Sequence, residues 1–166
     1  MMNTTTADIN FHELCEKLRS MKLSSMADTL EKQLANPNSG LQSFDERISE
    51  IICSEWDTRY NKKFNRFLKK ATLKYPAADI DESIYDADRF LDTTTIERLA
   101  ACNWIDEGKN LLITGSTGSG KTYISNALCI SALRLFHTVR YVKASTLIYE
   151  LGYRRISKLY KEAGSS

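Results

Sequence analysis

The stretch that decides the fold of this sequence runs from residue 110 to residue 122 and reads Asn-Leu-Leu-Ile-Thr-Gly-Ser-Thr-Gly-Ser-Gly-Lys-Thr. Its apolar start, Asn110 to Thr114, predicts a short buried strand. From Gly115 onward it has the form G-x-x-x-x-G-K-T, and residues 123–136 then carry apolar side chains at helical spacing. A strand, a glycine-rich loop and a helix in this order predict a P-loop, which binds phosphate groups in α/β domains.

The residue types in this loop suit a nucleoside triphosphate. The predicted nucleotide-binding residues are Gly115, Ser116, Thr117, Gly118, Ser119, Gly120, Lys121 and Thr122. Glycines let backbone N–H groups come close to phosphate oxygens, and the start of the following helix adds partial positive charge. Lys121 is predicted to reach the β and γ phosphates, and the Thr122 hydroxyl is predicted to ligate Mg²⁺.

The sequence after the loop predicts the opening of an α/β domain. A second strand is expected over residues 139–143 and a second helix over residues 144–160. The order is then βαβα, the start of a P-loop domain. We place this partial nucleotide-binding domain at residues 106–166.

Residues 1–105 have a different pattern and predict a helical region. Apolar residues at helical spacing predict a short helical pair with a break near Leu23. Ser43 and Glu46 form a capping-box pattern, so a helix is expected from Phe44 to about Lys74. After it, Thr94 and Glu97 repeat the capping-box spacing and predict another helix.

The long helix carries a basic stripe, and its function has two interpretations. The stripe consists of Arg59, Lys62, Lys63, Arg66, Lys69 and Lys70, which share one side of a helix. It is either a surface for nucleic-acid phosphates or a solvated face that pairs with the acidic residues between positions 76 and 100. The aromatic side chains Tyr60, Phe64 and Phe67 lie on another side, where core packing explains their spacing better than base stacking does.

The composition excludes several classes of protein. The 166 residues have a net charge of +2, which is too small for a uniformly basic nucleic-acid coat. No apolar run is long enough to span a membrane, and the start lacks a signal-peptide pattern, so we expect a cytoplasmic protein. The four cysteines are far apart and are expected to be reduced thiols in apolar surroundings. His12 and Cys15 alone do not make a metal site.

Together these features resemble the IstB family of transposition helper ATPases, relatives of the DnaC helicase loaders. The residues that carry the resemblance are Trp104-Ile105, the segment 110–115, the loop 118–122, Val139 to Val142 with Ala144 and Leu147, and, before them, Leu18, Leu23, Met26, Ser43-Phe44 and the basic segment ending at Tyr75-Pro76. The resemblance extends from about Leu14 to Leu151. Ser116 stands where proline is frequent in the family.

The resemblance implies an AAA+ type ATPase that assembles on duplex DNA in the presence of ATP and acts with a transposase, or with a replicative helicase in the loader interpretation. It favours DNA as the partner of the basic stripe and makes a homo-oligomer a further expectation. In the family's sheet the first two strands are not neighbours, because later strands lie between and beside them.

The acidic strand that holds Mg²⁺ and orients water for hydrolysis has no counterpart after Thr122. We therefore expect a chain truncated after the second strand, with ATPase activity left open. The alternative is a non-catalytic helical module that binds DNA or docks a protein and carries a vestigial nucleotide domain; ATP hydrolysis distinguishes the two. A small P-loop kinase is disfavoured because 109 residues precede the first strand.

Overall fold

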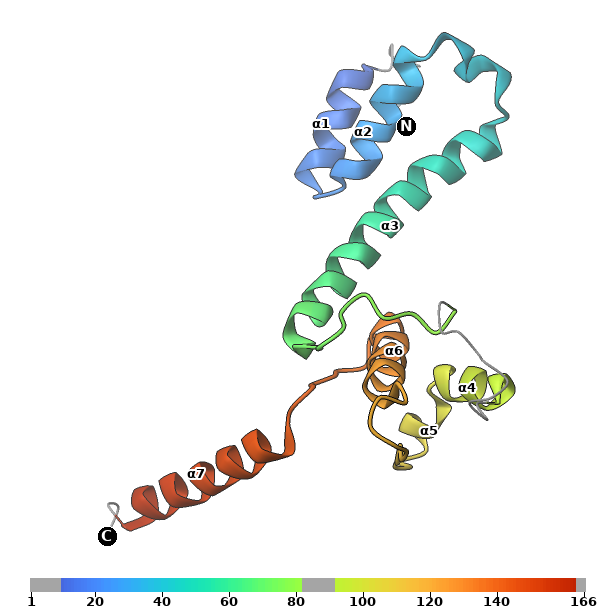
Figure 1. Cartoon of the computed structure of the whole chain (residues 1–166). Helices are drawn as coiled ribbons and strands as arrows, with labels where there is room; N and C mark the ends of the chain where they lie inside the picture. Colours follow the sequence, from blue (N-terminus) through green and yellow to red (C-terminus); the bar gives the residue numbers. More distant parts are fainter. Residues whose placement is uncertain (1–9, 82–91, 164–166) are drawn as a thin grey trace. The chain divides into compact units, whose positions relative to one another are not determined.

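A computed structural model describes residues 10–81 and 92–163 of the chain, in which the ordered elements are helices (Figure 1). The chain divides into two compact units, Met1–Lys63 and Phe64–Ser166. Within the described residues, no helix is both long enough and apolar enough to cross a membrane.

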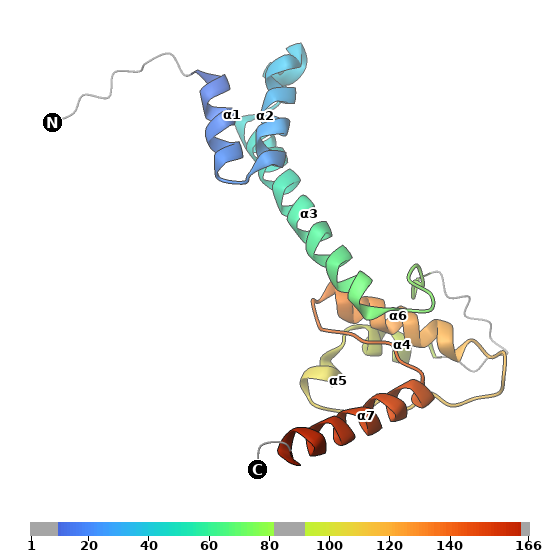
Figure 2. The same ribbon diagram turned by 90° about the vertical axis from the view of Figure 1, so that its left-hand side faces the viewer.

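The first unit begins with the predicted helical pair, α1 (Phe11–Ser20) and α2 (Ser24–Ala35), which lie side by side in both views (Figure 2). The Asn10 side chain caps α1 by accepting hydrogen bonds from two backbone N–H groups. Cys15 and Ala27 are buried between the helices. At the surface, Arg19 forms ion pairs with Asp28 and Glu31, at N–O distances of 3.0 and 2.8 Å. The helical pair is confirmed.

A 3₁₀ helix, η1 (Pro37–Leu41), leads from α2 into the long helix α3 (Phe44–Ala71). The predicted capping box at the start of α3 is confirmed. The Ser43 backbone N–H donates to Glu46 Oε2 at 2.8 Å, and the Glu46 N–H donates to Ser43 Oγ at 3.3 Å. The hydrogen bonds that the Ser43 N–H and the Ser43 hydroxyl donate to the Glu46 carboxylate lower its pKa. The helix ends at Ala71, before the predicted Lys74, because Thr72 adopts a left-handed conformation with φ 53°.

Glu55, on α3, provides the N-terminal cap that α2 lacks. No side chain next to α2 caps its first turn, and the Ser25 N–H instead donates to Glu55 Oε2 at 3.0 Å. Arg59 donates to the other carboxylate oxygen of Glu55 at 2.7 Å. The hydrogen bond from Arg59 is the main cause that lowers the pKa of Glu55. This contact between helices distant in sequence is not visible in any local motif.

Replacing Glu55 with glutamine is expected to destabilise the chain by about 1–3 kcal/mol at pH 7, because a charged hydrogen-bond acceptor is lost from a buried site. A carboxyl group with a lowered pKa stabilises the folded state above its unfolded pKa, and this contribution disappears as the pH falls through the folded pKa. Urea unfolding followed by circular dichroism should therefore show a smaller loss of stability below pH 4.5 in Glu55→Gln than in the wild type. Equal loss in both would contradict this role.

The second unit is built around α6 (Lys121–Arg134), which packs against α4 (Thr93–Ala100). Its core consists of Ala78, Ile80, Ile96, Ala127, Leu128 and Ile130, with Phe64 and Leu68 against it. Phe67 contacts Phe136 at a ring-centroid distance of 6.2 Å. Phe64 and Phe67 are thus partly buried and packed within the unit, which favours core packing over base stacking for these two predicted residues.

The remaining helices of the second unit are α5 (Asn103–Asp106) and α7 (Ala144–Ala163). The predicted capping box at Thr94 is wrong, because α4 begins at Thr93 and its cap is Asp92. The Asp92 side chain accepts hydrogen bonds from the Thr94 and Thr95 N–H groups, at 3.1 and 3.2 Å. An aspartate one residue before the helix takes this position more readily than a threonine inside it.

The two predicted strands are not formed, since the described residues contain no β-ladder. Residues 110–114 and 139–143 run as segments without a paired neighbour. A strand requires a neighbouring chain that takes its backbone hydrogen bonds. The Tyr141 N–H instead donates to Ala71 O at 2.8 Å, at the end of α3. The helices predicted after each segment are present as α6 and α7. Of the predicted βαβα order, the described residues thus form the two helices and neither strand.

Candidate functional site

The loop between residue 115 and α6 has the backbone conformations that its glycines were predicted to supply. Gly115, Gly118 and Gly120 have φ angles of 152°, 84° and 83°, a range that other residues rarely adopt. At Gly118 and Gly120 no atom lies within 4 Å of the place where a Cβ would be, so the backbone there is open to a ligand. At Gly115 a Cβ would lie 3.1 Å from Ser119 Oγ. The loop is therefore folded back on itself at Gly115 and open near the helix.

The first turn of α6 offers hydrogen-bond donors to an anion. Its N-cap residue is Gly120, which has no side chain to satisfy the first N–H groups of the helix. The partial positive charge of the helix start is greatest at this place. Lys121, the first residue of α6, adds an ammonium group whose Nζ donates to Gly115 O at 2.9 Å and Ser116 O at 2.5 Å. The Lys121 ammonium group thus bridges two backbone carbonyl groups at the other end of the loop.

The loop borders a hollow of about 310 Å³, to which Gly118, Gly120, Lys121 and Thr122 contribute. Lys74 and Tyr75 line the same hollow, from the segment that follows α3. The sequence did not predict a role at this site for either residue. The Lys74 ammonium lies 5.2 Å from the centre of the Tyr75 ring, which places a second positive charge beside the hollow. The described cations of the site are therefore Lys121 and Lys74.

Asn126 holds the wall of the hollow in place. Its side chain is fully buried. The amide Nδ2 donates to Thr122 O at 2.6 Å, and Oδ1 accepts the Tyr75 N–H at 3.1 Å. One side chain thereby joins the first turns of α6 to the segment after α3. An asparagine at the third position after a G-K-T-Y run, on the buried side of the helix, is the only signal in the sequence for this role.

Further along the same segment, Asp79 fixes a second point of contact with α6. The Asp79 N–H donates to the Tyr123 hydroxyl at 3.2 Å, and the Asp79 carboxylate pairs with Arg134 at 2.8 Å. The hydrogen bond from Arg134 is the main cause that lowers the pKa of Asp79. Tyr123 also contacts the Tyr75 ring, at a centroid distance of 6.1 Å. The position of Tyr75 is thus set by contacts at both ends of the segment.

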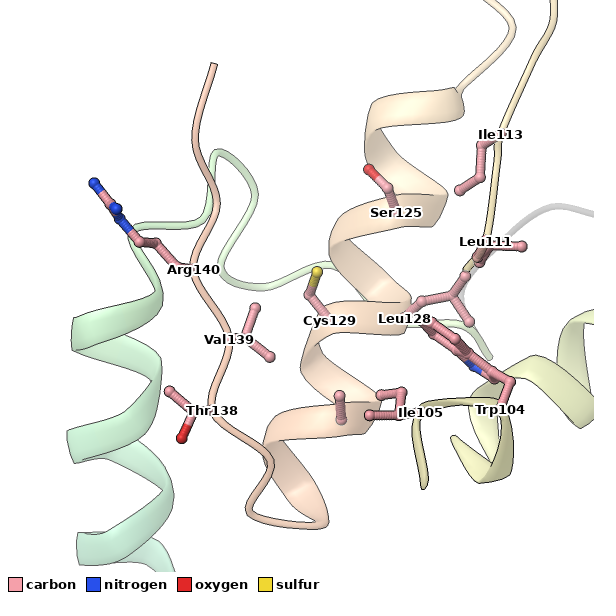
Figure 3. Close-up of a pocket in the computed structure, with 11 residues that line it drawn as sticks. Trp104, Ile105, Leu111, Ile113, Ser125, Leu128, Cys129, Thr138, Val139 and Arg140 are labelled. Carbon is pink, nitrogen blue, oxygen red and sulfur yellow. The ribbon is translucent and has the colours of Figure 1, made fainter. Parts of the chain in front are cut away.

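A second depression, apolar and about 350 Å³ in volume, lies along another side of α6 (Figure 3). Leu111 and Ile113 border it on one side and Val139 on the other, and Leu128 and Cys129 form its floor. Burial raises the pKa of the Cys129 thiol, which is therefore neutral. Ser125, Thr138 and Arg140 also border it, and Arg140 pairs with Glu150. The rest of the lining is mostly apolar, which does not favour a phosphate group. The depression separates the two segments that were predicted to be strands.

The cysteines agree with the prediction of free thiols, but one of them is not in apolar surroundings. Cys15 and Cys102 are buried, Cys129 is partly buried and Cys53 is exposed. Burial raises the pKa of Cys15 and Cys102. No group of three or more metal-ligating side chains occurs among the residues that the structure describes.

The basic stripe lies on α3, and its members differ in their surroundings. Arg59 is engaged within the first unit, because it bonds Glu55 and also donates to Lys22 O at 3.0 Å. Arg66 lies 5.7 Å from the centre of the Phe67 ring. The side chains of Lys62, Lys63, Lys69 and Lys70 are exposed. Arg59 therefore has a structural role that its place in a charge run did not predict.

Two of the acidic residues that the sequence offered as partners of the basic stripe are engaged elsewhere. Asp79 pairs with Arg134, and Asp92 caps α4. The other predicted partners include Glu82, Asp86 and Asp88, which lie outside the described residues. These two described aspartates therefore do not support the interpretation in which the basic stripe pairs with acidic residues of the same chain.

Comparison with known proteins supports ATP as a ligand. A family described as IstB-like ATP binding protein matches residues 16–161. The chain belongs to this family. It is 36% identical over 135 residues to an ATP-binding protein of insertion sequence IS1162 from Pseudomonas fluorescens, which covers 81% of this chain and 58% of that protein.

Other relatives are also ATP-binding proteins of insertion sequences. One from Sinorhizobium fredii is 31% identical over 144 residues, which is 87% of this chain and 58% of the relative. One from Mycobacterium tuberculosis is 30% identical over 134 residues, which is 81% of this chain and 53% of the relative. The chain therefore spans a little more than half the length of these IstB-like proteins.

Proposed function

We propose that this chain is an ATP-binding helper of DNA transposition, which binds duplex DNA in an ATP-dependent way and acts with a transposase. The open phosphate loop at the start of α6 is the observation that carries the proposal. Relatives of the chain are described as ATP-binding proteins of insertion sequences, which supports the same assignment. The proposed place of action is the cytoplasm, where the DNA is found.

The phosphates of ATP would lie in the hollow beside the loop. The N–H groups of the loop from Gly115 to Gly120 and of the first turn of α6 would donate to the phosphate oxygens. Lys121 would leave the carbonyl oxygens that it now contacts and bind the β and γ phosphates. Thr122 lines the hollow, and its hydroxyl would ligate Mg²⁺, whose charge would offset that of the phosphates. Lys74 supplies a second cation at the same hollow.

The DNA contact in this proposal is the exposed part of the basic stripe on α3. Lysine side chains on one side of a helix would bind the phosphates of a duplex without reading its bases. The described chain joins this helix directly to the ATP site, since only Thr72 and Leu73 separate α3 from Lys74. We accordingly assign DNA binding to residues 1–105 and ATP binding to residues 106–166, with Lys74 and Tyr75 contributing to the latter.

In the proposed complete fold, residues 110–114 and 139–143 become strands. The apolar depression between them is where further strands of the family's sheet would lie (Figure 3). Apolar side chains from such strands would cover Leu128 and Val139, which now line an open depression. We thus expect further strands to pack beside these two segments. The loop at the start of α6 is formed in the described residues without such strands.

The proposal predicts that ATP with Mg²⁺ increases the affinity of the wild-type chain for a mixed-sequence DNA duplex by about tenfold, which corresponds to a coupling of about 1.4 kcal/mol. Fluorescence anisotropy of a labelled duplex, with and without ATP and Mg²⁺, measures this effect. Calorimetric titration of ATP without DNA provides the first control. Saturable ATP binding without any change in DNA affinity would leave an ATP-binding protein but contradict the ATP-dependent DNA contact.

A further inference from the structure

The segment that follows α3 lies between two surfaces that the proposed function uses, both in the second unit. Before the segment are Lys69 and Lys70, the stripe lysines in the last turn of α3. Within it, Lys74 and Tyr75 line the hollow beside the phosphate loop. Only residues 71–73 separate Lys70 from Lys74, and the segment passes α6 in both views of the chain (Figure 1, Figure 2). A change at the hollow therefore has a short path to these two lysines.

Lys74 is available to an anion, because it forms no ion pair with an acidic side chain of the described residues. The residue is exposed, and its ammonium group lies 5.2 Å from the centre of the Tyr75 ring. A cation–π contact at an exposed site is weaker than a charge-assisted hydrogen bond to a phosphate. Phosphate groups in the hollow would therefore draw the Lys74 ammonium group away from the ring.

Asn126 links the same segment to the end of the P-loop. Its buried amide accepts a hydrogen bond from the Tyr75 N–H at 3.1 Å and donates one to Thr122 O at 2.6 Å. Thr122 and Tyr75 both line the hollow, so one side chain holds two parts of its lining. A ligand that fixes the position of Thr122 would thus also restrict the backbone at Tyr75.

Between α3 and Lys74 the chain turns at Thr72. Its φ of 53° is left-handed, a conformation that is costly for a β-branched residue and persists only where other contacts hold it. The Thr72 hydroxyl, which has one proton to donate, lies 2.8 Å from Ala71 O and 3.1 Å from Tyr141 O. Ala71 O also accepts the Tyr141 N–H at 2.8 Å. The turn at the end of α3 therefore depends on contacts outside it, and a shift of Lys74 would act on it directly.

We propose that residues 72–75 transmit nucleotide binding to the stripe lysines at the end of α3, with Lys74 as the cation of this segment that binds the phosphates of ATP. The inference rests on the proposed function, because it requires ATP in the hollow and DNA on the stripe. Binding of Lys74 to a phosphate, together with the Asn126 contact, orders the segment. A duplex that then binds Lys69 and Lys70 meets a last turn of α3 that is already ordered, so it loses less conformational entropy and binds more tightly.

The charge of Lys74 acts in the same direction as this ordering. The phosphates of ATP bring negative charge near the end of α3, which by itself would weaken the binding of DNA phosphates. Lys74 and Lys121 offset that charge at the hollow. Without Lys74 both the ordering and part of the neutralisation are lost. Bound ATP should then leave DNA affinity unchanged or lower it.

Hydrogen exchange measures the ordering step without DNA. Saturating ATP with Mg²⁺ should slow amide exchange at residues 72–75 about tenfold in the wild type and less than about twofold in Lys74→Ala. Lys143→Ala, which removes an exposed lysine of the same unit, is the control and should respond like the wild type. Calorimetry shows in parallel whether ATP is bound. ATP binding without slower exchange in the wild type would overturn this inference alone, whereas absence of ATP binding would contradict the proposed function and the inference with it.

Duplex binding at ATP concentrations that saturate each variant tests the transmission itself. The ratio of DNA affinity with ATP to that without ATP should be about ten in the wild type and about one or below in Lys74→Ala. Lys74→Arg keeps the positive charge and should restore the ratio. An equal loss of DNA affinity with and without ATP would make Lys74 only a further DNA contact and refute the proposal, as would an unchanged ratio in Lys74→Ala.

Thr72→Gly separates transmission from phosphate contact. Glycine adopts the left-handed conformation without strain, so the fold is kept, but the hydroxyl is lost and the turn has more freedom. ATP affinity should stay within about twofold of the wild type, while the gain in DNA affinity caused by ATP should fall below about threefold. Circular dichroism reports whether the helices are retained. A gain equal to that of the wild type would show that the turn at Thr72 does not transmit the effect, and would overturn the proposal.

Discussion

Removal of the four lysines from the basic stripe is expected to lower duplex DNA affinity by on the order of 10³-fold at 0.1 M salt. Each phosphate contact releases counterions and contributes about −0.9 to the slope of log K against log salt, so four lost contacts should reduce the slope by about 3.6. The variant carries alanine at Lys62, Lys63, Lys69 and Lys70. Fluorescence anisotropy of a labelled duplex over a range of salt concentrations measures both quantities.

The matched control changes the net charge by the same amount at lysines outside the stripe. It carries alanine at Lys17, Lys32, Lys109 and Lys143, all of which are exposed. If the loss in affinity reflects only the total charge, the two variants should bind alike. An unchanged salt slope in the stripe variant would place the DNA contact elsewhere on the chain. Arg59 is left intact in both, because it bonds Glu55 and its removal would disturb the first unit.

Local sequence signals predicted the parts of this structure that depend on neighbouring residues. The Ser43 capping box and the helix after the P-loop are both formed, because each is determined within a few residues along the chain. The left-handed glycines of the loop are likewise a local property. The match to the IstB-like family covers both segments, since it extends over residues 16–161.

The parts that the sequence did not predict depend on residues far apart in the chain. Glu55 caps a helix that begins 31 positions before it, and Asn126 bonds Tyr75 across 51 positions. No motif identifies the partners in such pairs, because they are set by how the helices pack, and for Asn126 the sequence offers only its place on the buried side of α6. The same limit explains Lys74 and Tyr75, which line the hollow beside the loop in a segment that Asn126 and Tyr123 contact from α6.

The predicted strands show the converse case, in which the local pattern is present but the partner is not. Leu111 and Ile113 face the apolar depression while Leu112 is exposed, which is the alternation of a strand. A strand is nevertheless a property of two chain segments, since its hydrogen bonds lie between them. The described residues provide no neighbouring strand for this segment. The alternation of side chains is therefore present, but the hydrogen bonds of a β-ladder are not formed.

Replacing Lys121 with alanine is expected to weaken ATP binding about 100-fold or more while the helix content stays unchanged. Hydrogen bonds to charged groups contribute about 1.5–3 kcal/mol each, and every 1.4 kcal/mol changes affinity tenfold. In the present structure Lys121 contacts only loop carbonyl oxygens through Nζ, so its loss leaves no buried group unsatisfied. Alanine is also a favourable residue within a helix. Calorimetric titration with ATP and Mg²⁺ measures the affinity, and circular dichroism measures the helix content.

Lys143→Ala is the control for this variant, because it removes an exposed lysine from the same unit, away from the hollow. Its ATP affinity should equal that of the wild type, which separates a local contact from a general effect of charge. ATP binding that survives unchanged in Lys121→Ala would contradict the role assigned to Lys121 and leave Lys74 as the other described cation that lines the hollow. The double variant Lys121→Ala, Lys74→Ala then shows whether the remaining ATP binds in this hollow or elsewhere. A further loss of ATP affinity locates ATP in the hollow, and an unchanged affinity locates it outside.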